Sequence, residues 1–414
     1  MNDQDKRVQQ PVRQNYTLFW MCVLVGVNQL GFGAMVPSLP LYAQSFGVTA
    51  SAIGLAVGIY GLARFLVALP SGWLSDGLGR RHALAIGGLV SGIGNLWCAW
   101  ATSYPEFIVA RFVAGAGAGM IVTTGHIVLA DISTPERRGR MLSIYMGSFI
   151  FAVGIGPFPG GLLAEHYGLA APFWAYGAAS LIAMLVAWFA ISETRDLSAA
   201  PVSAGSTAPS FIDQMRILQA QIGFLLASLI QFMNAVVRTG GLFTIIPILA
   251  TTNLGLSMSE IGFAMMLGSV TGLVAAYPTG WVTDQFGRKS VIVPATLLAG
   301  ASMLVFCFAL SYAWFVAAAI VWGVASTVGG SAPAAYAADT APHGMNAAAM
   351  STFRWMGDAG YVIGPLALGL IVDLYGPVAS LVLSAALLML VGIAFAVYAP
   401  ETFRGRDSGL PPNN

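Results

Sequence analysis

Charge is scarce in this sequence of 414 residues, because Asp, Glu, Lys and Arg together make up only 8% of it. A soluble domain normally carries about a quarter of charged residues, so the chain has too little polar surface for a water-soluble fold. The 18 basic and 17 acidic residues nearly balance, which excludes a nucleic-acid-binding protein. The three cysteines, Cys22, Cys98 and Cys307, lie far apart in apolar stretches. We therefore predict buried thiols and neither a disulfide framework nor a zinc site.

Motifs that would indicate catalysis or nucleotide binding are also lacking. The chain has no Gly-rich phosphate loop of the Walker type, which argues against an ATP-driven pump. It has no His/Asp/Glu constellation for a metal and no nucleophile elbow, which argues against a membrane enzyme. We therefore predict no catalytic residue, no metal and no cofactor.

Hydrophobic residues are abundant, at 57% of the chain with a mean hydropathy of +0.77. Uncharged stretches of about 18 residues or more recur, and each can cross a bilayer core of roughly 30 Å as a helix. The first apolar run has no convincing cleavage site, so it is predicted to be a span and not a signal peptide. The twelve predicted spans are 16–41, 51–73, 83–102, 106–130, 141–164, 170–192, 219–248, 259–281, 290–311, 314–338, 347–372 and 377–399. The seventh is long enough that tilting or a break is expected.

The basic residues outside the spans lie only in the two tails and in alternate loops. The loops 41–51, 102–106, 165–170, 249–259, 311–314 and 373–377 contain no Lys or Arg. The positive-inside rule therefore predicts that both termini are cytoplasmic, in a multi-pass protein of the cell (plasma or inner) membrane. An even number of spans requires the same result.

The chain repeats itself with a constant offset of 208 residues. Examples are Pro70/Pro278, Trp73/Trp281, Asp76/Asp284, Arg80/Arg288, Asp131/Asp339, Pro157/Pro365 and Glu193/Glu401. We predict an all-α membrane protein of two six-helix halves related by an axis along the membrane normal. The predicted segments are an N-terminal tail 1–15, a first half 16–194, a linker 195–218, a second half 219–402 and a C-terminal tail 403–414. The segment Arg195–Gln221 is rich in Ala, Ser, Pro and Gly, which predicts a flexible cytoplasmic linker.

A Gly-x-x-x-Asp-x-x-Gly-Arg pattern occurs twice, after the second and eighth predicted spans. The first copy consists of Gly72, Asp76, Gly79 and Arg80, followed by the basic residue Arg81. The second consists of Gly280, Asp284, Gly287 and Arg288, followed by the basic residue Lys289. We expect the glycines to let helices approach closely, Asp76 to accept hydrogen bonds from a helix N-terminus, and Arg80 to pair with Asp131. Topological anchoring alone would explain the basic residues but not the repeated Gly/Asp spacing.

This pattern resembles the loop between the second and third helices of the major facilitator superfamily, and the resemblance covers essentially the whole chain. It implies the twelve-helix major facilitator fold, alternating access, and a latch that stabilises the outward-open state. Arg111-x-x-x-Gly115-x-Gly117 is similar to a motif whose buried arginine is implicated in proton coupling. A third pattern, Gly156, Pro157, Gly160 and Gly161 with Gly364 and Pro365 in its repeat, resembles an antiporter motif. Here Pro157 should bend the helix, and the glycines should pack tightly against the other half. The resemblance to the drug/proton antiporter group favours efflux over uptake.

Four arginines lie within the predicted spans, namely Arg64, Arg111, Arg238 and Arg354, and Asp358 is the one carboxylate deep within a span, since the other acidic residues lie in loops or near span ends. An arginine at a helix centre is costly, so each is expected to face a partner or a wet cavity. Asp358 is predicted to pair either with Arg64 across the two halves or with Arg354 one turn away. A static pair that orients helices is the alternative to a role in proton coupling.

The first span offers Asn28 and Gln29 where many drug/proton antiporters have a carboxylate. Asp358 is therefore the main candidate for carrying the coupling proton, with Arg354, Arg64, Arg111 and His126 as further members of the relay. A histidine in this position is more often a helix-packing residue. The predicted cavity residues are Asn28, Gln29, Phe32, Gln231, Asn234, Arg238 and Tyr361. Four arginines against one acid would suit an anionic or zwitterionic ligand.

The sequence therefore predicts a secondary active transporter that exports a small organic molecule in exchange for protons. The alternatives are a uniporter, a proton-coupled uptake symporter, and a transporter-like sensor or scaffold. The expected partners are a small-molecule substrate, protons and the lipid bilayer, with no nucleic acid, and we expect a monomer.

Overall fold

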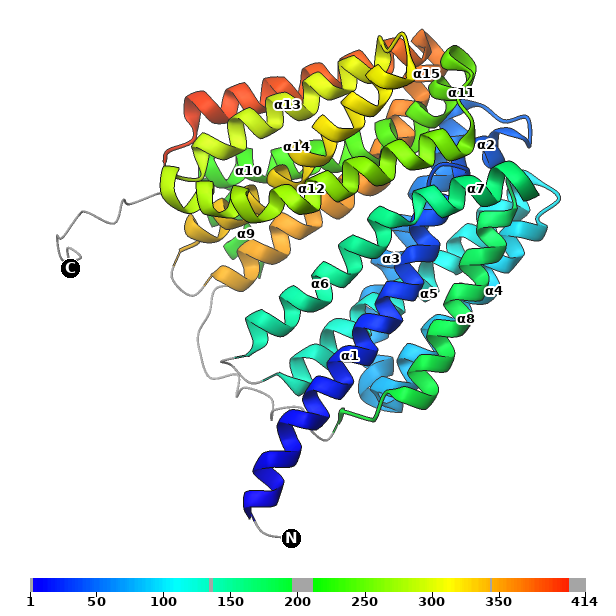
Figure 1. Ribbon diagram of the computed structural model, residues 1–414. Coiled ribbons are helices and arrows are strands. Elements are labelled where there is room, and N and C mark those ends of the chain that lie inside the picture. Colours follow the sequence, from blue (N-terminus) through cyan, green and yellow to red (C-terminus); the bar gives the residue numbers. More distant parts are fainter. Residues whose placement is uncertain (1–2, 134–136, 196–210, 343–344, 402–414) are drawn as a thin grey trace. The chain divides into compact units, whose positions relative to one another are not determined.

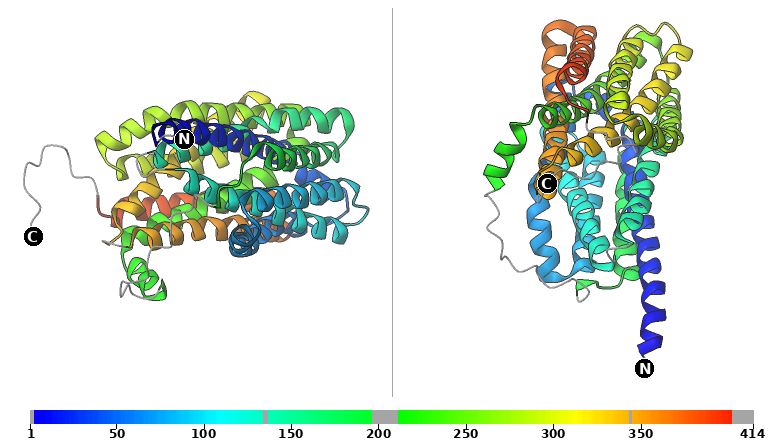
Figure 2. Two further views of the ribbon diagram at one scale, coloured as in Figure 1. Left: turned by 90° about the horizontal axis from the view of Figure 1, so that it is seen from below. Right: turned by 90° about the vertical axis from the view of Figure 1, so that its left-hand side faces the viewer.

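The computed structural model describes residues 3–133, 137–195, 211–342 and 345–401 (Figure 1). These residues form helices joined by short turns, with no strand among them. The chain divides into two compact units, residues 1–205 with 250–266 (unit 1) and residues 206–249 with 267–414 (unit 2). Within each unit the long helices run side by side (Figures 1 and 2).

Unit 1 contains eight complete helices and parts of two more. They are α1 (Asp3–Met35), α2 (Leu39–Gln44), α3 (Ala50–Leu78), α4 (Arg80–Trp100), α5 (Tyr104–Ile132), α6 (Arg138–Ile155), α7 (Pro157–Tyr167), α8 (Ala171–Ala190), the end of α11 (Ile246–Leu254) and the first residues of α12 (Met258–Phe286). α4 packs between α5 and α8, α3 packs on α5, and α1 packs on α6 and α8. The ends of α3, α4 and α5 that carry Arg80 and Asp131 form what we call the basic end of the unit.

Unit 2 contains the remaining helices. They are α9 (Phe211–Gln219), α10 (Ile222–Val236), the π-helix Val237–Ile245, the first residues of α11, most of α12, α13 (Lys289–Cys307), α14 (Tyr312–Asp339) and α15 (Asn346–Tyr398). α15 packs on α10 and α13, and α13 also packs on α14. The end of the unit that carries Arg288 and Asp339 is its basic end.

Eleven helices in the described part of the chain are long and apolar enough to cross a membrane. The longest of them lies in α15, which runs for 53 residues but has a non-helical backbone at Gly376, with φ 86° and ψ 166°. Gly376 lies at the turn predicted between the last two spans, 347–372 and 377–399. The observed helices therefore fit the predicted all-α membrane fold, with an interruption where a separate last span was expected.

The first predicted span, 16–41, is wrong at its C-terminal end. α1 ends at Met35, and a separate short helix begins at Leu39. Pro37 lies between them, and a residue that precedes proline is disfavoured in the helical conformation. The long helix therefore ends before the proline.

The seventh predicted span, 219–248, contains the irregularity expected from its length. A π-helix, Val237–Ile245, joins α10 to α11. The Thr244 hydroxyl donates a hydrogen bond of 2.7 Å to the carbonyl of Thr239, five residues earlier. Segments of π-helix are rare and often lie at functional sites. Arg238, which lies within this segment, is therefore a candidate functional residue.

The predicted linker is not flexible throughout. α9 forms within it and is amphipathic, with Leu218 fully buried. Leu218 packs in a cluster with Phe224 of α10, Ala337 of α14 and Phe353 of α15. The Ala/Ser/Pro composition that predicted flexibility belongs to residues before α9, and residues 196–210 lie outside the described part of the chain.

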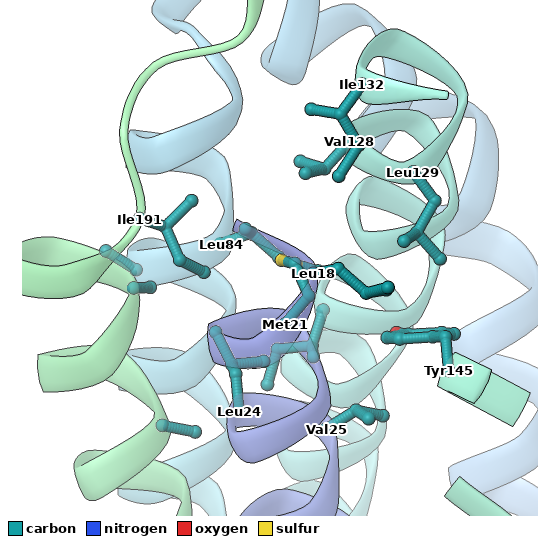
Figure 3. Packing of buried hydrophobic residues seen from close by; sticks show 14 of the residues in the cluster. Leu18, Met21, Leu24, Val25, Leu84, Val128, Leu129, Ile132, Tyr145 and Ile191 are labelled. Carbon is teal, nitrogen blue, oxygen red and sulfur yellow. The ribbon is translucent and has the colours of Figure 1, made fainter. Parts of the chain in front are cut away.

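The core of unit 1 lies where α1, α4, α5, α6 and α8 meet. Figure 3 shows the side chains of this cluster, which include Leu18, Met21, Leu24, Val25, Leu84, Val128, Leu129, Ile132, Tyr145 and Ile191. In unit 2 an equivalent cluster includes Ile230, Ile292, Tyr336 and Phe395. Of the three predicted buried thiols, Cys98 is fully buried, whereas Cys22 and Cys307 are partly buried.

Small residues allow α5 to cross α3 at close distance. A Cβ atom added to Gly115 would overlap the backbone of Tyr60, and one added to Gly119 would overlap the backbone of Arg64. On the opposite face of α5, Gly117 lies equally close to Ser91 of α4. The Arg-x-x-x-Gly-x-Gly motif therefore has a packing role, because glycines let helix backbones approach within a membrane protein.

We expect Gly115→Ala to destabilise the protein by about 1–3 kcal/mol, because the added methyl group must push α3 away from α5. Gly147→Ala in α6 is the matched control, since a Cβ atom there meets nothing within 4 Å. This control should be neutral or stabilising by up to about 1 kcal/mol. Thermal unfolding of both variants in detergent measures the difference, and equal midpoints would contradict the packing role.

Candidate functional site

The basic end of unit 1 holds a buried charge cluster centred on Arg80. The Nε atom of Arg80 donates to Oδ2 of Asp131 at 2.8 Å, and its Nη1 donates to Oδ1 of Asp76 at 2.8 Å and to the Ser75 carbonyl at 3.1 Å. The Asp131 carboxylate also accepts from the Thr194 hydroxyl at 3.1 Å. The predicted Arg80–Asp131 pair is therefore present, and the side chains are only 5% and 7% exposed.

Asp76 accepts a hydrogen bond from the Arg80 side chain, and its predicted hydrogen bond from a helix N-terminus stays a prediction. The N-terminus of α4 is bound by Glu193, which follows α8. Its carboxylate accepts from the backbone N–H groups of Arg80 at 2.9 Å and Arg81 at 3.3 Å. Glu193 is not among the predicted site residues, although the repeat marks it through its match with Glu401.

Four backbone N–H groups determine the protonation of Glu193. Burial by itself raises the pKa of the Glu193 carboxyl, but hydrogen bonds from the N–H groups of Arg80, Arg195, Arg81 and Thr194 outweigh it. Those of Thr194 and Arg195 are both 3.0 Å long. The pKa of Glu193 in the folded protein is therefore lower than its ordinary value.

This lowered pKa predicts a loss of stability in acid. The stabilisation by Glu193 is complete above the unfolded-state pKa of about 4.3 and disappears as the pH falls through the lower folded-state value. We expect Glu193→Gln to cost about 0.3–1 kcal/mol at neutral pH, where the wild-type charge faces a helix N-terminus. Unfolding curves of both proteins from pH 7 to pH 3 should converge at the acid end. A difference that is independent of pH would contradict this role.

The same cluster recurs in unit 2 with longer and more exposed contacts. Arg288 Nε lies 3.1 Å from Asp339 Oδ2, and its Nη1 donates to the Thr283 carbonyl at 3.0 Å. The Glu401 carboxylate accepts from the N–H groups of Arg288 and Lys289, both at 3.3 Å. The side chains of Arg288 and Asp339 are 20% and 39% exposed. The fold therefore reproduces the sequence repeat in three dimensions.

The glycines of the predicted latch differ from one another in backbone conformation and in packing. Gly79 and Gly287 have φ values of 98° and 91°, which only glycine adopts readily, and each directly precedes the Arg that begins the charge cluster. A Cβ atom on Gly72 would meet nothing within 4 Å, so the expected close helix approach is wrong there. The side chain of Asp284 and the surroundings of Gly280 lie outside the described part of the structure.

Arg111 occupies the interior of unit 1 and is fully buried. Its guanidinium stacks on the Tyr60 ring at 4.4 Å from the centroid, and its Nε donates to the Ala56 carbonyl at 3.1 Å. Its Nη1 lies 3.3 Å from the Met35 sulfur, and its Nη2 is buried without a hydrogen-bond partner. Among the described residues no carboxylate forms an ion pair with Arg111. Aromatic stacking and neutral acceptors therefore hold this cation.

Aromatic residues surround this arginine. The Tyr60 hydroxyl lies 2.8 Å from that of Tyr176 in α8, and Phe32 of α1 packs against both rings, at 5.6 Å and 6.4 Å. Arg64 follows Tyr60 by one turn of α3 and is partly buried. Phe32 and Arg64 are among the predicted site residues, whereas Tyr60 and Tyr176 are not. Tyr60 nevertheless lies four residues before Arg64, which places both on one face of α3.

Asn28 lies in a buried polar network with serine residues of α4 and α8. Its Nδ2 donates to the Ser180 hydroxyl at 3.2 Å, and the Ser180 and Ser91 hydroxyls lie 3.1 Å apart. Asn95 donates to the Ser91 carbonyl at 2.8 Å. Asn28 and Gln29 are both buried. Contact of either residue with a substrate stays a prediction.

His126 lies fifteen residues after Arg111 on α5, about four helical turns away. Its Nδ1 lies 2.7 Å from the Val122 carbonyl, and its ring packs edge-on against Tyr145 of α6 at 5.7 Å. These contacts are typical of a helix-packing histidine, which is the alternative left open by the sequence. Its role in proton transfer stays a prediction.

The Gly-Pro motif lies where α6 ends at Ile155 and α7 begins at Pro157. Gly156 between them keeps a helical backbone, so the predicted bend at Pro157 stays a prediction. Gly160 and Gly161 of this motif pack against different helices. Gly160 faces the backbone of Ala34 in α1, within the first half, whereas Gly161 faces the Met258 backbone at the start of α12.

The corresponding Gly364–Pro365 pair lies inside α15 without a helix break. A Cβ atom on Gly364 would overlap Val236 at the end of α10, and one on Gly240 would overlap Gly364. Close packing of α15 on α10 is therefore the role the structure gives to Gly364.

In unit 2, Arg354 and Asp358 lie one turn apart on α15. The Arg354 Nε and the Asp358 Oδ2 are 4.0 Å apart, and the side chains are 62% and 52% exposed. The pairing with Arg354, one of the two predicted partners, is therefore present. Arg64 belongs to unit 1, and its pairing with Asp358 stays a prediction.

The remaining predicted cavity residues also lie in unit 2. The Gln231 side chain lies against Gly357 of α15, and Asn234 Nδ2 donates to the Gly329 carbonyl of α14 at 3.3 Å. Arg238 is exposed in the π-helix, and Tyr361 is partly buried in α15. Their contact with a substrate stays a prediction. No group of three His, Cys, Asp or Glu residues suited to a metal ion occurs within the described ranges.

Comparison with known proteins agrees with this architecture. A model of the Major Facilitator Superfamily matches residues 21–237 and 224–412. The chain belongs to this superfamily. As a member of the Major Facilitator Superfamily it is a multi-pass membrane transporter and not an enzyme.

Sequence relatives span most of the chain. It is 24% identical over 385 residues to an uncharacterized MFS-type transporter of Methanocaldococcus jannaschii, covering 92% of this chain and 97% of the relative. It is 24% identical over 289 residues to the multidrug resistance protein MdtL of a Shewanella species, covering 68% of this chain and 70% of MdtL.

Solved structures show the same fold. A bacterial homologue of the human lysosomal transporter Spinster, in an inward-facing and unoccupied conformation, has a TM-score of 0.74 at 15% identity, covering 93% of this chain and 96% of the other. The human organic anion transporter MFSD10 has a TM-score of 0.58 at 19% identity, covering 92% and 99%.

Proposed function

We propose that this protein is a secondary active transporter that exports a small organic molecule in exchange for protons by alternating access. The observation that carries the proposal is the Arg354–Asp358 pair, a half-exposed carboxylate beside a cation within an apolar helix. Ionisable residues within membrane helices are costly and usually mark ion or substrate pathways. The name of the relative MdtL, a multidrug resistance protein, supports export of organic molecules.

Arg111 supports an anionic or zwitterionic substrate. Its cation has no carboxylate partner among the described residues, and one guanidinium nitrogen is buried without a hydrogen bond. A substrate carboxylate would supply a charge-assisted hydrogen bond that aromatic stacking does not. The proposed substrate contacts are Asn28, Gln29, Phe32, Gln231, Asn234, Arg238 and Tyr361.

The two charge clusters at the basic ends support the proposed conformational latch. Because positively charged loops stay in the cytoplasm, we place both basic ends and both termini on the cytoplasmic side. We propose that Arg80 with Asp76 and Asp131, and Arg288 with Asp339, stabilise one conformation more than the other. Such contacts shift the population only by their difference in free energy between the two states.

Transport by purified protein in sealed proteoliposomes tests this function. Carboxyfluorescein, an anion, and ethidium, a lipophilic cation, serve as probes with and without a pH gradient, while a trapped pH dye follows protons. We expect gradient-driven flux of the anion with proton movement in the opposite direction. Equal flux without a gradient would indicate a uniporter, and proton movement in the same direction would indicate a symporter. Absence of protein-dependent flux for a wider panel of organic anions and zwitterions would favour a sensor or scaffold.

A further inference from the structure

A cation–aromatic cluster at the basic end of unit 1 lies outside the proposed transport site. The Arg81 guanidinium lies over the Trp188 ring, 5.2 Å from its centroid. The His82 ring meets the same indole edge-on, with centroids 5.4 Å apart and an interplanar angle of 86°. Arg81 and His82 begin α4, and Trp188 lies two residues before the end of α8. These three residues are the Arg81 cluster.

The positive charge of Arg81 has no acidic partner in the described structure. Arg80, its neighbour, pairs with two carboxylates, whereas Arg81 forms no ion pair and its Nε is buried without a hydrogen-bond partner. The nearest acidic group, Glu193, binds the backbone N–H of Arg81 and not its guanidinium. Stacking on an aromatic ring stabilises an arginine but leaves its N–H donors available. The cluster is therefore able to accept an anionic group.

The Arg81 cluster is not repeated in the second half of the chain, although the charge cluster around Arg80 is. The charge cluster around Arg80 recurs in unit 2, but 208 residues after Arg81, His82 and Trp188 the chain has Lys289, Ser290 and Ala396. The Lys289 Nζ donates to the Ala399 carbonyl at 2.9 Å, so this cation is used internally. The second half thus forms the same helix ends without an available arginine, a histidine or an indole. Helix packing therefore does not require the Arg81 cluster.

The surroundings of the cluster suit a lipid molecule. Trp188 is 43% exposed, and the neighbouring apolar side chains Leu185, Phe189 and Leu78 are exposed as well. Tryptophan is enriched where membrane and water meet, and exposed apolar side chains below it contact acyl chains. Basic pockets between helices at the cytoplasmic surface bind anionic lipid headgroups.

We propose that the Arg81 cluster binds the phosphate headgroup of an anionic phospholipid in the cytoplasmic leaflet. The guanidinium supplies a planar pair of N–H donors to the phosphate oxygens, and the His82 ring supplies a further N–H. The exposed face of α8 below Trp188 contacts the acyl chains. This site is independent of the transported substrate and of proton coupling.

Binding of phosphatidylglycerol to the purified full-length protein tests this proposal. The protein is held in nanodiscs with phosphatidylcholine as the neutral background, and native mass spectrometry counts retained phosphatidylglycerol. We expect Arg81→Gln to weaken this binding roughly five- to tenfold. Arg81→Lys should keep part of it, because the charge remains and the planar donor pair is lost. Trp188→Leu, which keeps the charge but removes the stacking surface, should also weaken it.

Lys289→Gln is the matched control, because it removes the equivalent cation of the second half and should leave phosphatidylglycerol binding unchanged. Variants are compared only after circular dichroism and thermal unfolding show that they are folded, and Arg81→Lys keeps the test decisive if Arg81→Gln does not fold. The proposal is overturned if phosphatidylglycerol binding survives Arg81→Gln and Trp188→Leu, or if Lys289→Gln reduces it equally. It is also overturned if inorganic phosphate competes as strongly as the lipid, which would indicate a site for free phosphate.

Discussion

Asp358→Asn is expected to abolish uphill transport while leaving downhill exchange intact. The carboxylate is the proposed proton carrier, and Arg354 lies 4.0 Å from it on the same helix face. Asparagine has a similar shape but cannot carry the proton. Substrate binding and passive exchange should therefore persist without coupling.

The size of this effect follows from the gradient. For exchange of one proton per substrate at zero membrane potential, a difference of about one pH unit supports at most roughly tenfold accumulation, whereas the variant should reach a ratio of about one. Arg354→Gln is the matched control, because it removes the cation of the pair and keeps the carboxylate. We expect it to retain measurable gradient-driven accumulation of carboxyfluorescein in proteoliposomes. Wild-type accumulation by Asp358→Asn would assign the pair to helix orientation alone.

Arg80→Gln should cause the largest loss of stability among single charge changes. Arg80 and Asp131 are almost completely buried, and their Nε–Oδ2 distance is 2.8 Å. Removing one member of a buried pair leaves the other charge without compensation, which costs about 3–5 kcal/mol. The Thr194 hydroxyl remains as a donor to Asp131 but carries no charge. The unfolding midpoint in detergent should fall accordingly.

The second half of the chain provides the control for this experiment. Arg288→Gln breaks the equivalent pair, but its side chains are more exposed, at 20% and 39%, and its contact is longer, at 3.1 Å. A partly solvated pair contributes about 0–1 kcal/mol, so this variant should unfold near the wild-type midpoint. Adding Asp131→Asn to Arg80→Gln should recover part of the lost stability. Equal losses for Arg80→Gln and Arg288→Gln would show that burial does not distinguish the two clusters.

Several site residues could be predicted from the sequence because the same residue types recur at matching positions of the two halves. The offset of 208 residues selected Arg80 and Asp131 among many polar residues, and the structure pairs them. Helical spacing likewise placed Arg354 next to Asp358. Glu193 belonged to the same repeat, but nothing in its spacing indicates that it binds the N-terminus of α4, 113 residues earlier in the chain.

Other contacts had no signal in the sequence at all. Periodicity shows that Asn28 shares a helix with apolar neighbours, but not that it meets Ser180 instead of open space. A buried arginine in α5 was expected to need a partner, yet its stacking on Tyr60 depends on how closely α3 approaches α5. That distance is set by the glycines of α5 and by the side chains of the facing helix together.

The sequence by itself determined the membrane class, the all-α fold, the duplication and the positions of the charged loops. These properties depend on hydrophobic length, on charge distribution and on a constant offset, which are all readable along one chain. The tertiary structure decided which carboxylate binds which helix end, which cation stacks on which ring, and why Arg81 is available while Lys289 is not. Such choices depend on the distances between helices that are far apart in sequence, and only packing in three dimensions sets those distances.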